Sequence, residues 1–285
     1  MPDLAALERR IDTVYRPLPL DARSRALRHL VIRGLKGGER GHLGSALSVI
    51  DLLRVLYDDI LRHNPADPAW PERDRCLLSK GHGCLALYAV LADHGYFDKA
   101  ELDRFCRFDG ILGGHPEAAK IPGVEASTGA LGHGPSIGLG MALAARMQRA
   151  DHKVIVVTGD GEINEGAVWE AALMAGKHGL DNYTVIVDYN KLQSYGPTAE
   201  VQDLEPLTDK WASFGFVVRN VDGHDILAMR QLLAELPFSG GSPNCIISHT
   251  VKGRGVSYAE HNADWHHKSK LSDAEIDDLL AEIGE

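Results

Sequence analysis

The segment VIVVTGDGEINEGAVWE, which begins at residue 154, places a carboxylate between two glycines at the end of an apolar, β-branched run. Gly159 and Gly161 can adopt positive φ and let a ligand approach the backbone closely, and Asp160 would then point toward that ligand. A second apolar run leads to Asn190, with 28 residues between Gly161 and Asn190. If the two runs are neighbouring strands, a carboxylate, a carboxamide and a local carbonyl oxygen meet there. Such oxygen ligands suit Mg²⁺, which commonly bridges protein carboxylates and substrate phosphates.

A simpler interpretation of the Gly-Asp-Gly motif is a tight turn in which Asp160 caps the following helix through its side chain. Short glycine motifs often match by chance, so this interpretation is favoured for the motif taken alone. The asparagine after the next apolar run makes the ligand interpretation much stronger. Together, Asp160 and Asn190 therefore indicate a magnesium and phosphate site.

The elements expected to position these residues follow a regular order along the chain. Three segments near the amino terminus carry apolar residues at helical spacing, and after them short apolar runs alternate with helical patterns. Continuous apolar runs imply strands buried on both faces, so the alternation predicts an α/β fold with a doubly wound, mostly parallel sheet and helices on both faces. In such sheets ligands bind beyond the carboxyl ends of the strands. The expected helices near the amino terminus are roughly 4–15, 21–36 and 46–61, and the expected strands are 75–79, 153–158, 183–188, 216–223 and 245–250.

The composition is that of an ordinary globular protein and excludes several functions. The 285 residues are 44% apolar and 25% charged, which allows a sizeable core without disulfide or metal cross-links. With a formal charge of −10 and no basic tract, nucleic acid and anionic membranes are poor candidates as partners. The sequence shows no signal peptide or membrane-spanning run, and its cysteines form no CxxC pair, so we expect a cytoplasmic protein with reduced thiols. The cysteines are Cys76, Cys84, Cys106 and Cys245.

Several blocks of the sequence resemble the transketolase family. The stretch GDGEINEGAVWEAALMAGKHGLDNYTVIVDYNKLQ resembles the thiamine-diphosphate motif, in which Gly-Asp-Gly is followed, after the next strand, by Asn. Further blocks resemble the amino-terminal domain of that family and occur in the family's order; they are GERGHLGSALSVIDLLRVLY, DRCLLSKGHGCLALYAVL, LGGHPEAAKIPGVEASTGALGHG and HTVKGRGVSYAEHNADWHHK. The resemblance covers roughly residues 23–268. It implies a single diphosphate- and Mg-binding domain of the thiamine-diphosphate-binding fold over 1–285, with a helical segment at about 1–62.

The resemblance also implies which residues bind the cofactor. Asp160 and Asn190 would bind Mg²⁺, or another divalent ion such as Ca²⁺ or Mn²⁺, with the main-chain carbonyl of Leu192 as the third protein ligand. Gly132 and Gly134 would direct backbone N–H groups toward the diphosphate, beside the positive end of the helix that follows. The implied thiamine-diphosphate set is His82, Gly132, His133, Gly134, Gly159, Asp160, Gly161, Asn190, Leu192 and His266.

Four histidines in glycine-rich or irregular segments are predicted to be catalytic by the same resemblance. His82 and His266 are expected at the diphosphate and in the substrate channel, and His42 and His115 chiefly at the substrate. Imidazoles there can donate to sugar hydroxyls and transfer protons. The family's usual Trp-His-Gly is Trp-His-His here, so His267 is an alternative to His266 as the working residue.

Other positions in these blocks allow more than one interpretation. Glu165 and Glu170 match family glutamates buried near the subunit interface, but they would equally suit an exposed helix face favoured by the helix dipole. Trp169 and Trp211 are expected to be packing residues. His133 stands where the family usually has Gln, which leaves the backbone role of that segment intact but assigns no contact to the side chain.

By this resemblance the chain is one subunit of a split transketolase that transfers a two-carbon ketol unit from a ketose phosphate to an aldose phosphate. The cofactor supplies the reactive carbanion, while the pyrimidine-binding domain with its activating glutamate is expected on a separate transketolase carboxyl-terminal chain. Two copies of each chain are expected to form a heterotetramer. Two alternatives stay open. One is a related ketol-transferring enzyme, similar to deoxyxylulose-phosphate synthase, acting on an unusual sugar, because KLQSYG departs from the family's LQIDG. The other is a non-catalytic cofactor-binding or assembly subunit.

Overall fold

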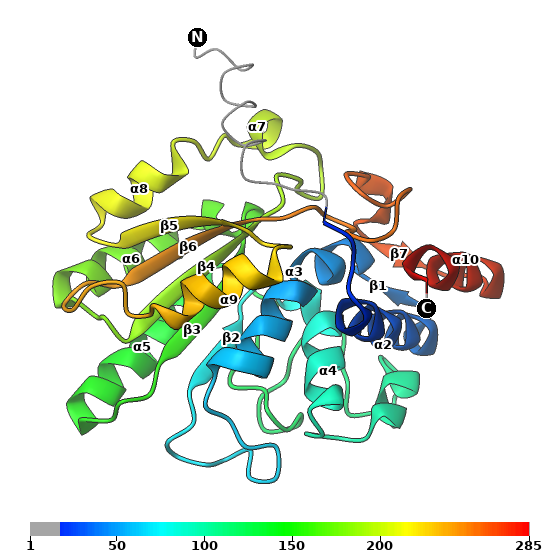
Figure 1. Cartoon of the computed structure of the whole chain (residues 1–285), viewed down its shortest axis with the longest axis horizontal. Coiled ribbons are helices and arrows are strands. Elements are labelled where there is room, and N and C mark those ends of the chain that lie inside the picture. Colours follow the sequence, from blue (N-terminus) through cyan, green and yellow to red (C-terminus); the bar gives the residue numbers. More distant parts are fainter. Residues whose placement is uncertain (1–17, 285) are drawn as a thin grey trace.

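A parallel sheet of five strands forms the centre of the molecule in residues 18–284, the part of the chain that this computed structural model describes. The strand order across the sheet is β2-β3-β4-β6-β5, and every pair of neighbours is parallel. The α/β fold with a mostly parallel sheet is thus confirmed, and each strand lies within two residues of its predicted bounds. The strands are β2 (Arg75–Leu78), β3 (Val154–Gly159), β4 (Tyr183–Tyr189), β5 (Val217–Asp222) and β6 (Asn244–His249) (Figure 1).

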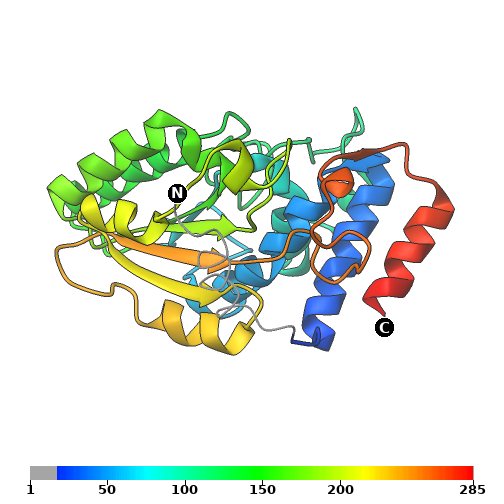
Figure 2. The same ribbon diagram turned by 90° about the horizontal axis from the view of Figure 1, so that it is seen from above.

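The sheet is covered by helices on both faces, as the continuous apolar runs predicted. Alternate residues of β3 belong to different apolar clusters: Val154 and Val156 pack with helices α5, α6 and α8, whereas Ile155 and Val157 pack with α3, α4 and α9. Figure 2 shows α5 and α6 on one side of the sheet and α9 on the other. The helices are α2 (Ala22–Gly38), α3 (Leu43–Val55), α4 (Cys84–Asp93), α5 (His133–Gln148), α6 (Gly166–His178), α7 (Thr198–Val201), α8 (Leu207–Ser213), α9 (Ile226–Ala234) and α10 (Asp273–Ile283).

The helices near the amino terminus agree only in part with their predicted bounds. The predicted helix 4–15 lies outside the described residues. The prediction 21–36 is confirmed as α2, which is capped by the Asp21 carboxylate accepting from the Ser24 N–H. The prediction 46–61 begins too late, because α3 already starts at Leu43 and all its residues are buried, so no polar face marks its start. None of the helices in residues 18–284 is long and apolar enough to cross a membrane.

A small antiparallel sheet that the sequence did not predict joins two distant segments. Strand β1 (Arg40–Gly41), which lies between α2 and α3 in the chain, pairs with β7 (Lys268–Ser269), which precedes α10. Helix α10 begins with a capping box in which Ser272 and Glu275 exchange hydrogen bonds, and it lies beside α2 (Figure 1). The segment before β7 is thereby brought back to the start of α3, near the carboxyl ends of the large sheet's strands.

The packing of α5 on β3 makes a testable prediction. A methyl group added to Gly138 of α5 would lie 2.4 Å from Val156 Cγ2 and 3.2 Å from Tyr183 Cε2, whereas one added to Gly140 has no neighbour within 4 Å. We therefore expect Gly138→Ala to lower the free energy of unfolding by about 1–3 kcal/mol through overpacking. Gly140→Ala, the matched control, should raise it by roughly 0.5–1 kcal/mol through helix propensity. Urea unfolding followed by circular dichroism measures both, and equal effects would contradict the described contact.

Candidate functional site

The ends of β3 and β4 bring the predicted metal ligands together. Gly159 pairs with Asp188 across the two strands, so the residues that follow, Asp160 and Asn190, emerge at the same edge of the sheet. They border a cavity of about 190 Å³, called the inner cavity below. Of the predicted site residues, those lining the inner cavity are His82, Gly159, Asp160, Gly161, Asn190, Leu192 and His266.

Hydrogen bonds fix the oxygen atoms of this edge. Asp160 accepts from the Gly161 N–H through Oδ1 (2.7 Å) and from the Lys191 N–H through Oδ2 (2.6 Å). Asn190 Oδ1 accepts from the Leu192 N–H at 3.2 Å. Asp160 therefore does cap a short turn, as the simpler interpretation held, but it also ties the β3 loop to the β4 loop. Each of these oxygens keeps lone-pair capacity for a further ligand.

The electrostatics of Asp160 favour a cation at this edge. Burial, together with the neighbouring Asp188 carboxylate, raises the pKa of Asp160 to about 6. A carboxylate in this setting is stabilised in its charged form by a positive ligand. The ammonium of Lys252 lies nearby, where burial lowers the pKa of this lysine to about 8. Lys252 Nζ donates to the carbonyl of Leu192 at 2.6 Å, which is the third predicted metal ligand.

The oxygen atoms present are chemically suited to a magnesium ion bound together with a phosphate ligand. Within residues 18–284, no three His, Cys, Asp or Glu side chains form a group that could hold a metal ion. The predicted set contains one carboxylate, one carboxamide and one carbonyl, from Asp160, Asn190 and Leu192. Since Mg²⁺ requires six oxygen ligands and commonly takes some of them from substrate phosphates, these three residues fit a metal that arrives with a diphosphate.

A buried ion pair lies beneath the inner cavity. The Lys80 ammonium pairs with the Asp188 carboxylate, and their side chains are 1% and 0% exposed. Asp188 also accepts from the hydroxyls of Ser48 and Thr250. Although burial opposes it, Lys80 and these hydroxyls hold the pKa of Asp188 below its usual value. The pair therefore joins the end of β2 to the end of β4.

Glu162 is a second buried carboxylate at this edge. It accepts from the Gly159 N–H at 2.9 Å, from the Gly132 N–H at 2.9 Å and from the hydroxyl of Ser79. Glu162 thus connects the ends of β2 and β3 to the loop before α5. The Gly132 amide that was predicted to face the diphosphate donates to Glu162 in the structure.

Four imidazoles gather above the inner cavity. The ring centre of His42 lies 5.3 Å from that of His82, 5.4 Å from that of His266 and 4.7 Å from that of His267. His42 Nδ1 lies 3.2 Å from the carbonyl oxygen of His266, so this nitrogen is the donor and Nε2 is left as an acceptor. His266 Nε2 lies 2.9 Å from the Ser194 hydroxyl. His266 and His267 therefore both belong to the cluster, and His266 lies closer to the predicted ligands because it lines the inner cavity.

Three of these imidazoles, those of His42, His82 and His266, are neutral near pH 7. Burial is the main cause that lowers the pKa of His42 to about 4. Burial and the Lys252 ammonium lower the pKa of His266 to about 3, and burial and Lys80 bring the pKa of His82 well below its usual value. Neutral imidazoles can both donate and accept hydrogen bonds, as proton transfer requires.

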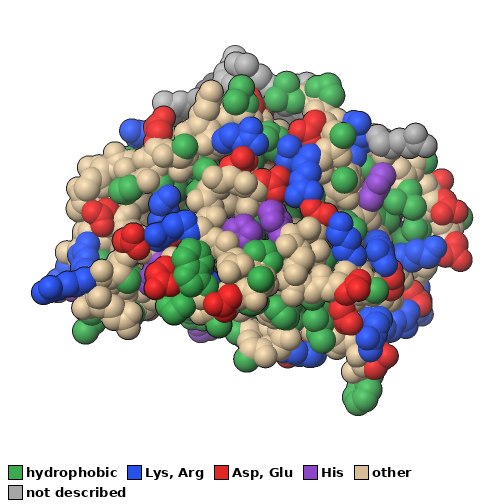
Figure 3. Space-filling model, turned by 60° about the horizontal axis from the view of Figure 1, so that its bottom comes forward, with side chains coloured by type: hydrophobic (Ala, Val, Ile, Leu, Met, Phe, Trp, Pro, Cys, Tyr) green, Lys and Arg blue, Asp and Glu red, His purple; other side chains and the backbone are tan. Residues whose placement is uncertain are grey.

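A larger cavity of about 750 Å³, called the outer chamber below, adjoins the inner cavity. Its walls include His42, His115 and His267, and His82 lines both cavities. Figure 3 shows histidine side chains near the centre of one face of the molecule, with lysine and arginine side chains nearby. The structure therefore brings all four predicted catalytic histidines to two connected cavities.

The remaining predicted residues lie outside both cavities. Gly134 packs so closely on Ser79 that an added Cβ would lie 2.1 Å from its hydroxyl oxygen, and His133 is exposed. Glu165 and Glu170 are exposed in this chain, which leaves their interface interpretation as a prediction. The packing role of the two tryptophans is confirmed, because the rings of Trp169 and Trp211 lie 5.0 Å apart and Trp211 is buried.

The sequence analysis missed three side chains that the structure places at the candidate site. Lys80 is the second residue after β2 and Lys252 the third after β6, so both stand near the carboxyl end of a strand, where the fold places ligands. Applying that rule to every strand, and not only to the two that end in Gly-Asp-Gly and Asn, finds both. Glu162 carries no such signal, since a glutamate at the start of a turn is common and its hydrogen-bond donors are fixed only by the tertiary fold.

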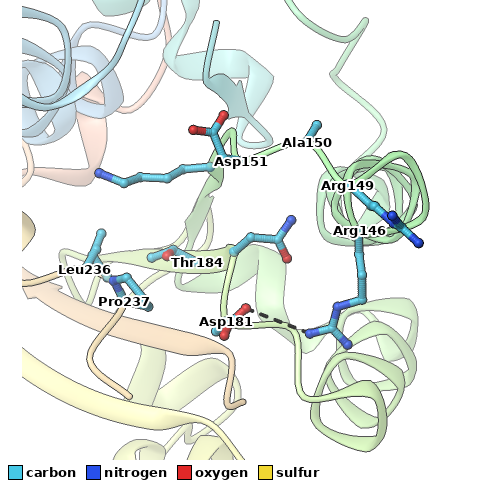
Figure 4. Close-up of a pocket in the computed structure, with 10 residues that line it drawn as sticks. Arg146, Arg149, Ala150, Asp151, Asp181, Thr184, Leu236 and Pro237 are labelled. Carbon is cyan, nitrogen blue, oxygen red and sulfur yellow. Dashed lines mark ion pairs between the residues drawn. The ribbon is translucent and has the colours of Figure 1, made fainter. Parts of the chain in front are cut away.

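Another cavity, of about 440 Å³, lies near the amino-terminal ends of β3 and β4, away from the candidate site (Figure 4). Its walls include Asp151 and Thr184 near the starts of β3 and β4, and Arg146, whose guanidinium lies 3.8 Å from the Asp181 carboxylate. This cavity contains none of the predicted site residues and carries charges of both signs. It is therefore not part of the candidate site.

Comparisons with known proteins show the family of this chain. Residues 21–285 match the family described as transketolase, thiamine diphosphate binding domain. The chain is 39% identical over 266 residues to an apulose-4-phosphate transketolase subunit of Phocaeicola vulgatus, covering 93% of this chain and 94% of that protein. It is 38% identical over 266 residues to 6-deoxy-6-sulfo-D-fructose transketolase subunit SqwG of Clostridium sp., and the match covers 93% of this chain and 96% of that protein. Among solved structures it is similar to transketolase from Leishmania mexicana, with a TM-score of 0.85 and 33% identity, covering 92% of this chain and 41% of that one.

The hydrogen bonds of Glu162 make a prediction about stability. In Glu162→Gln, either orientation of the amide turns an NH₂ group toward the N–H of Gly132 or of Gly159, which leaves a buried donor without an acceptor. We expect the free energy of unfolding to fall by about 1–3 kcal/mol. Glu170→Gln, an exposed glutamate on α6, is the matched control and should change little. Chemical denaturation measures both, and a Glu162→Gln variant as stable as this control would show that the carboxylate does not join these loops.

Proposed function

Because this chain belongs to the transketolase family of transferases and contains its thiamine-diphosphate-binding domain, we propose that it is the diphosphate-binding subunit of a two-chain transketolase. The proposed reaction transfers a two-carbon ketol unit from a ketose to an aldose. The observation that carries this proposal is the convergence of Asp160, Asn190 and the carbonyl of Leu192 at one buried cavity beneath the histidine cluster.

In the proposed site, Asp160, Asn190 and Leu192 hold a divalent metal ion, preferably Mg²⁺, that binds together with the diphosphate of thiamine diphosphate. Lys252 is near enough to the same oxygens to compensate the diphosphate charge. When bound, thiamine diphosphate would supply the nucleophilic carbon and the electron sink that breaking and forming a carbon–carbon bond next to a carbonyl require.

The histidines of this chain are assigned to the substrate. The neutral rings of His42 and His82 meet edge to face at 5.3 Å between ring centres; His42 lines the outer chamber, and His82 lines both cavities. One ring nitrogen can hold a sugar hydroxyl while another accepts its proton, as cleavage and formation of a carbon–carbon bond next to a hydroxyl require. His266 and Ser194 can orient the same hydroxyls, and His115 lies further out, in the wall of the outer chamber.

A separate partner chain is the third part of the proposal. The relatives named as transketolase subunits have almost the length of this chain, with 94% and 96% of them covered. In contrast, the match to this chain covers only 41% of the Leishmania mexicana transketolase. We propose that a transketolase carboxyl-terminal chain supplies the pyrimidine-binding half of the site, in a heterotetramer of two plus two chains.

The relatives' names also bear on the sugar. One is named for apulose 4-phosphate and the other for 6-deoxy-6-sulfo-D-fructose. Both sugars carry an acidic group, a phosphate in one and a sulfonate in the other. We therefore propose a phosphorylated or sulfonated sugar as the substrate class.

Loss of the Asp160 carboxylate tests the metal site. Without it the diphosphate and its metal ion lose a charged ligand, so Asp160→Ala should weaken Mg²⁺-dependent binding of thiamine diphosphate at least tenfold, about 1.4 kcal/mol. Calorimetric titration with Mg²⁺, and again after its removal by a chelator, measures this. Asp151→Ala, an exposed carboxylate at the opposite edge of the sheet, should bind as the unchanged protein does. Unaltered affinity in Asp160→Ala would overturn the metal assignment.

The two-chain proposal predicts that this chain alone does not turn over sugars. Saturating Mg²⁺ and thiamine diphosphate should give no ketol transfer from xylulose 5-phosphate to ribose 5-phosphate, because the group that activates the pyrimidine is on the partner. Addition of the carboxyl-terminal chain should give turnover. The two chains should bury an interface of more than about 2,000 Å². An enzyme assay and analytical ultracentrifugation check this. Robust turnover by the isolated chain would contradict the proposal.

A further inference from the structure

A buried polar network holds the segment that follows β6. Asp51 of α3 accepts hydrogen bonds from Arg28 of α2 and from His224, which stands two residues before α9. His224 in turn accepts from the main-chain N–H of Val251, and the next residue is Lys252, which lines the inner cavity. We propose that His224 is a positioning residue, which fixes the main chain that carries Lys252 and so keeps this lysine at the inner cavity. The proposal rests on the function proposed above and deepens it, because it names a residue that supports the cofactor site from outside.

The two ring nitrogens of His224 have different roles. Nε2 accepts from the Val251 N–H at 2.8 Å, so the ring proton is on Nδ1. Nδ1 lies 2.9 Å from Asp51 Oδ2 and donates to it. In a histidine, the hydrogen bond that one nitrogen makes decides the protonation of the other. The Asp51 carboxylate therefore orients the ring with its lone pair toward the Val251 N–H.

Asp51 is itself fixed in its charged form. Its two oxygens accept from the two terminal nitrogens of Arg28, at 2.8 and 2.7 Å, and Oδ1 also accepts from the Ser24 hydroxyl at 2.8 Å. Although burial opposes it, the charge and the hydrogen bonds of Arg28 hold the pKa of Asp51 below its usual value. A charged acceptor makes a stronger hydrogen bond than a neutral one. The orientation of the His224 ring is therefore held firmly.

The network holds the segment on both sides of Lys252. Before this lysine, His224 accepts from the Val251 N–H; after it, Arg28 Nε donates to the carbonyl of Arg254 at 3.0 Å. The residues that make these contacts come from different elements, since Arg28 belongs to α2 and His224 precedes α9, which packs on α3 (Figure 1). The main chain at Lys252 is therefore tied to the helical layer on that face of the sheet.

The ammonium of Lys252 depends on its main chain for its position. In the described part of the chain, no carboxylate forms an ion pair with Lys252. Its Nζ donates to the Leu192 carbonyl at 2.6 Å, and the residue is buried. The ammonium stands at the end of a flexible four-carbon stem. A shift of the main chain therefore moves the ammonium relative to the oxygens of the predicted metal site.

The position of the ring proton can be tested in the unchanged chain without any cofactor. Long-range ¹H–¹⁵N correlation spectra distinguish an imidazole protonated on Nδ1 from one protonated on Nε2. We expect the Nδ1 form for His224, whose signals are assigned by their loss in His224→Gln. A proton on Nε2 would overturn the proposal, because the ring could not then accept from the Val251 N–H.

Two substitutions each keep one half of the histidine. In His224→Gln the amide oxygen can replace Nε2 and accept from Val251. In His224→Asn the amide NH₂ can replace Nδ1 and donate to Asp51, but the Val251 N–H loses its acceptor. At saturating Mg²⁺ we expect His224→Asn to bind thiamine diphosphate about tenfold or more weakly, and His224→Gln to stay within about threefold of the unchanged chain. Calorimetric titration measures both.

Hydrogen exchange tests the main chain itself, again without cofactor. The amides of Thr250 and Gly253 flank the affected segment and donate to the carbonyls of Tyr189 and Gly44. They should exchange about tenfold or more faster in His224→Asn than in His224→Gln, while the amides of β3 exchange alike in both. Equal exchange at Thr250 and Gly253 in the two variants would count against any positioning by His224.

A lysine variant tests whether His224 acts through Lys252. In a Lys252→Met background, His224→Asn and His224→Gln should bind the cofactor alike; an undiminished difference would overturn the proposal. The matched control is His63, whose ring nitrogens lie 3.1 Å from the Tyr96 hydroxyl and 2.9 Å from the Tyr57 carbonyl. It lines neither cavity, so His63→Asn and His63→Gln should both bind as the unchanged chain does.

The outcomes separate this role from a loss of stability and from the proposed function. Urea unfolding gives the free energy of unfolding of each variant. If cofactor affinity simply follows this free energy across the His224 and His63 variants, His224 is only structural and the proposal fails. An unchanged chain that does not bind thiamine diphosphate would contradict the proposed function. The Nδ1 proton and the faster exchange in His224→Asn would still support the positioning of the Lys252 segment.

Discussion

The ion pair between Lys80 and Asp188 is the interaction on which the rest of the site depends. Either charge alone would be strongly unfavourable in this interior, since an unpaired buried ion costs several kcal/mol. The pair fixes the ends of β2 and β4 to each other, and Asp188 draws in Ser48 of α3 and Thr250 after β6. One carboxylate therefore sets the relative positions of four segments, and it also accepts from the amide of Asn190, a predicted metal ligand, at 3.3 Å.

Positive charge in the site comes from lysines and arginine and not from the histidines. Burial and the ammonium groups of Lys80 and Lys252 lower the pKa of His82 and of His266 and keep these imidazoles neutral. The two lysines line the inner cavity, and Arg40 lies in the wall of the outer chamber. Between them is a neutral region lined by imidazoles, which can exchange protons with hydroxyls. The site therefore keeps fixed positive charge apart from the neutral groups that can exchange protons.

The sequence predicted what depends on local pattern and failed where the outcome depends on distant contacts. Parallel pairing of two β-branched runs was enough to place Asp160 beside Asn190, because neighbouring strands end at the same edge. The β1–β7 pair has two residues in each strand, too short for any periodicity to show. The partner of the Gly132 amide could not be predicted either, since a nearby glutamate competes with the expected ligand for the same N–H. The start of α3 was missed because a helix that is buried on all sides has no polar face, so the sequence shows no periodic pattern of apolar and polar residues there.

The hydrogen bonds that assemble the site join residues far apart in the chain, and this bears on when the site forms during folding. The separations are 83 residues for Ser79–Glu162, 108 for Lys80–Asp188 and 140 for Ser48–Asp188. Contacts of high sequence separation require large loops to close and slow the folding of proteins that depend on them. The last partner of Asp188 in chain order is Thr250, which follows β6. During synthesis, the carboxylate at the centre of the site therefore cannot acquire all its hydrogen bonds until nearly the whole sheet has left the ribosome.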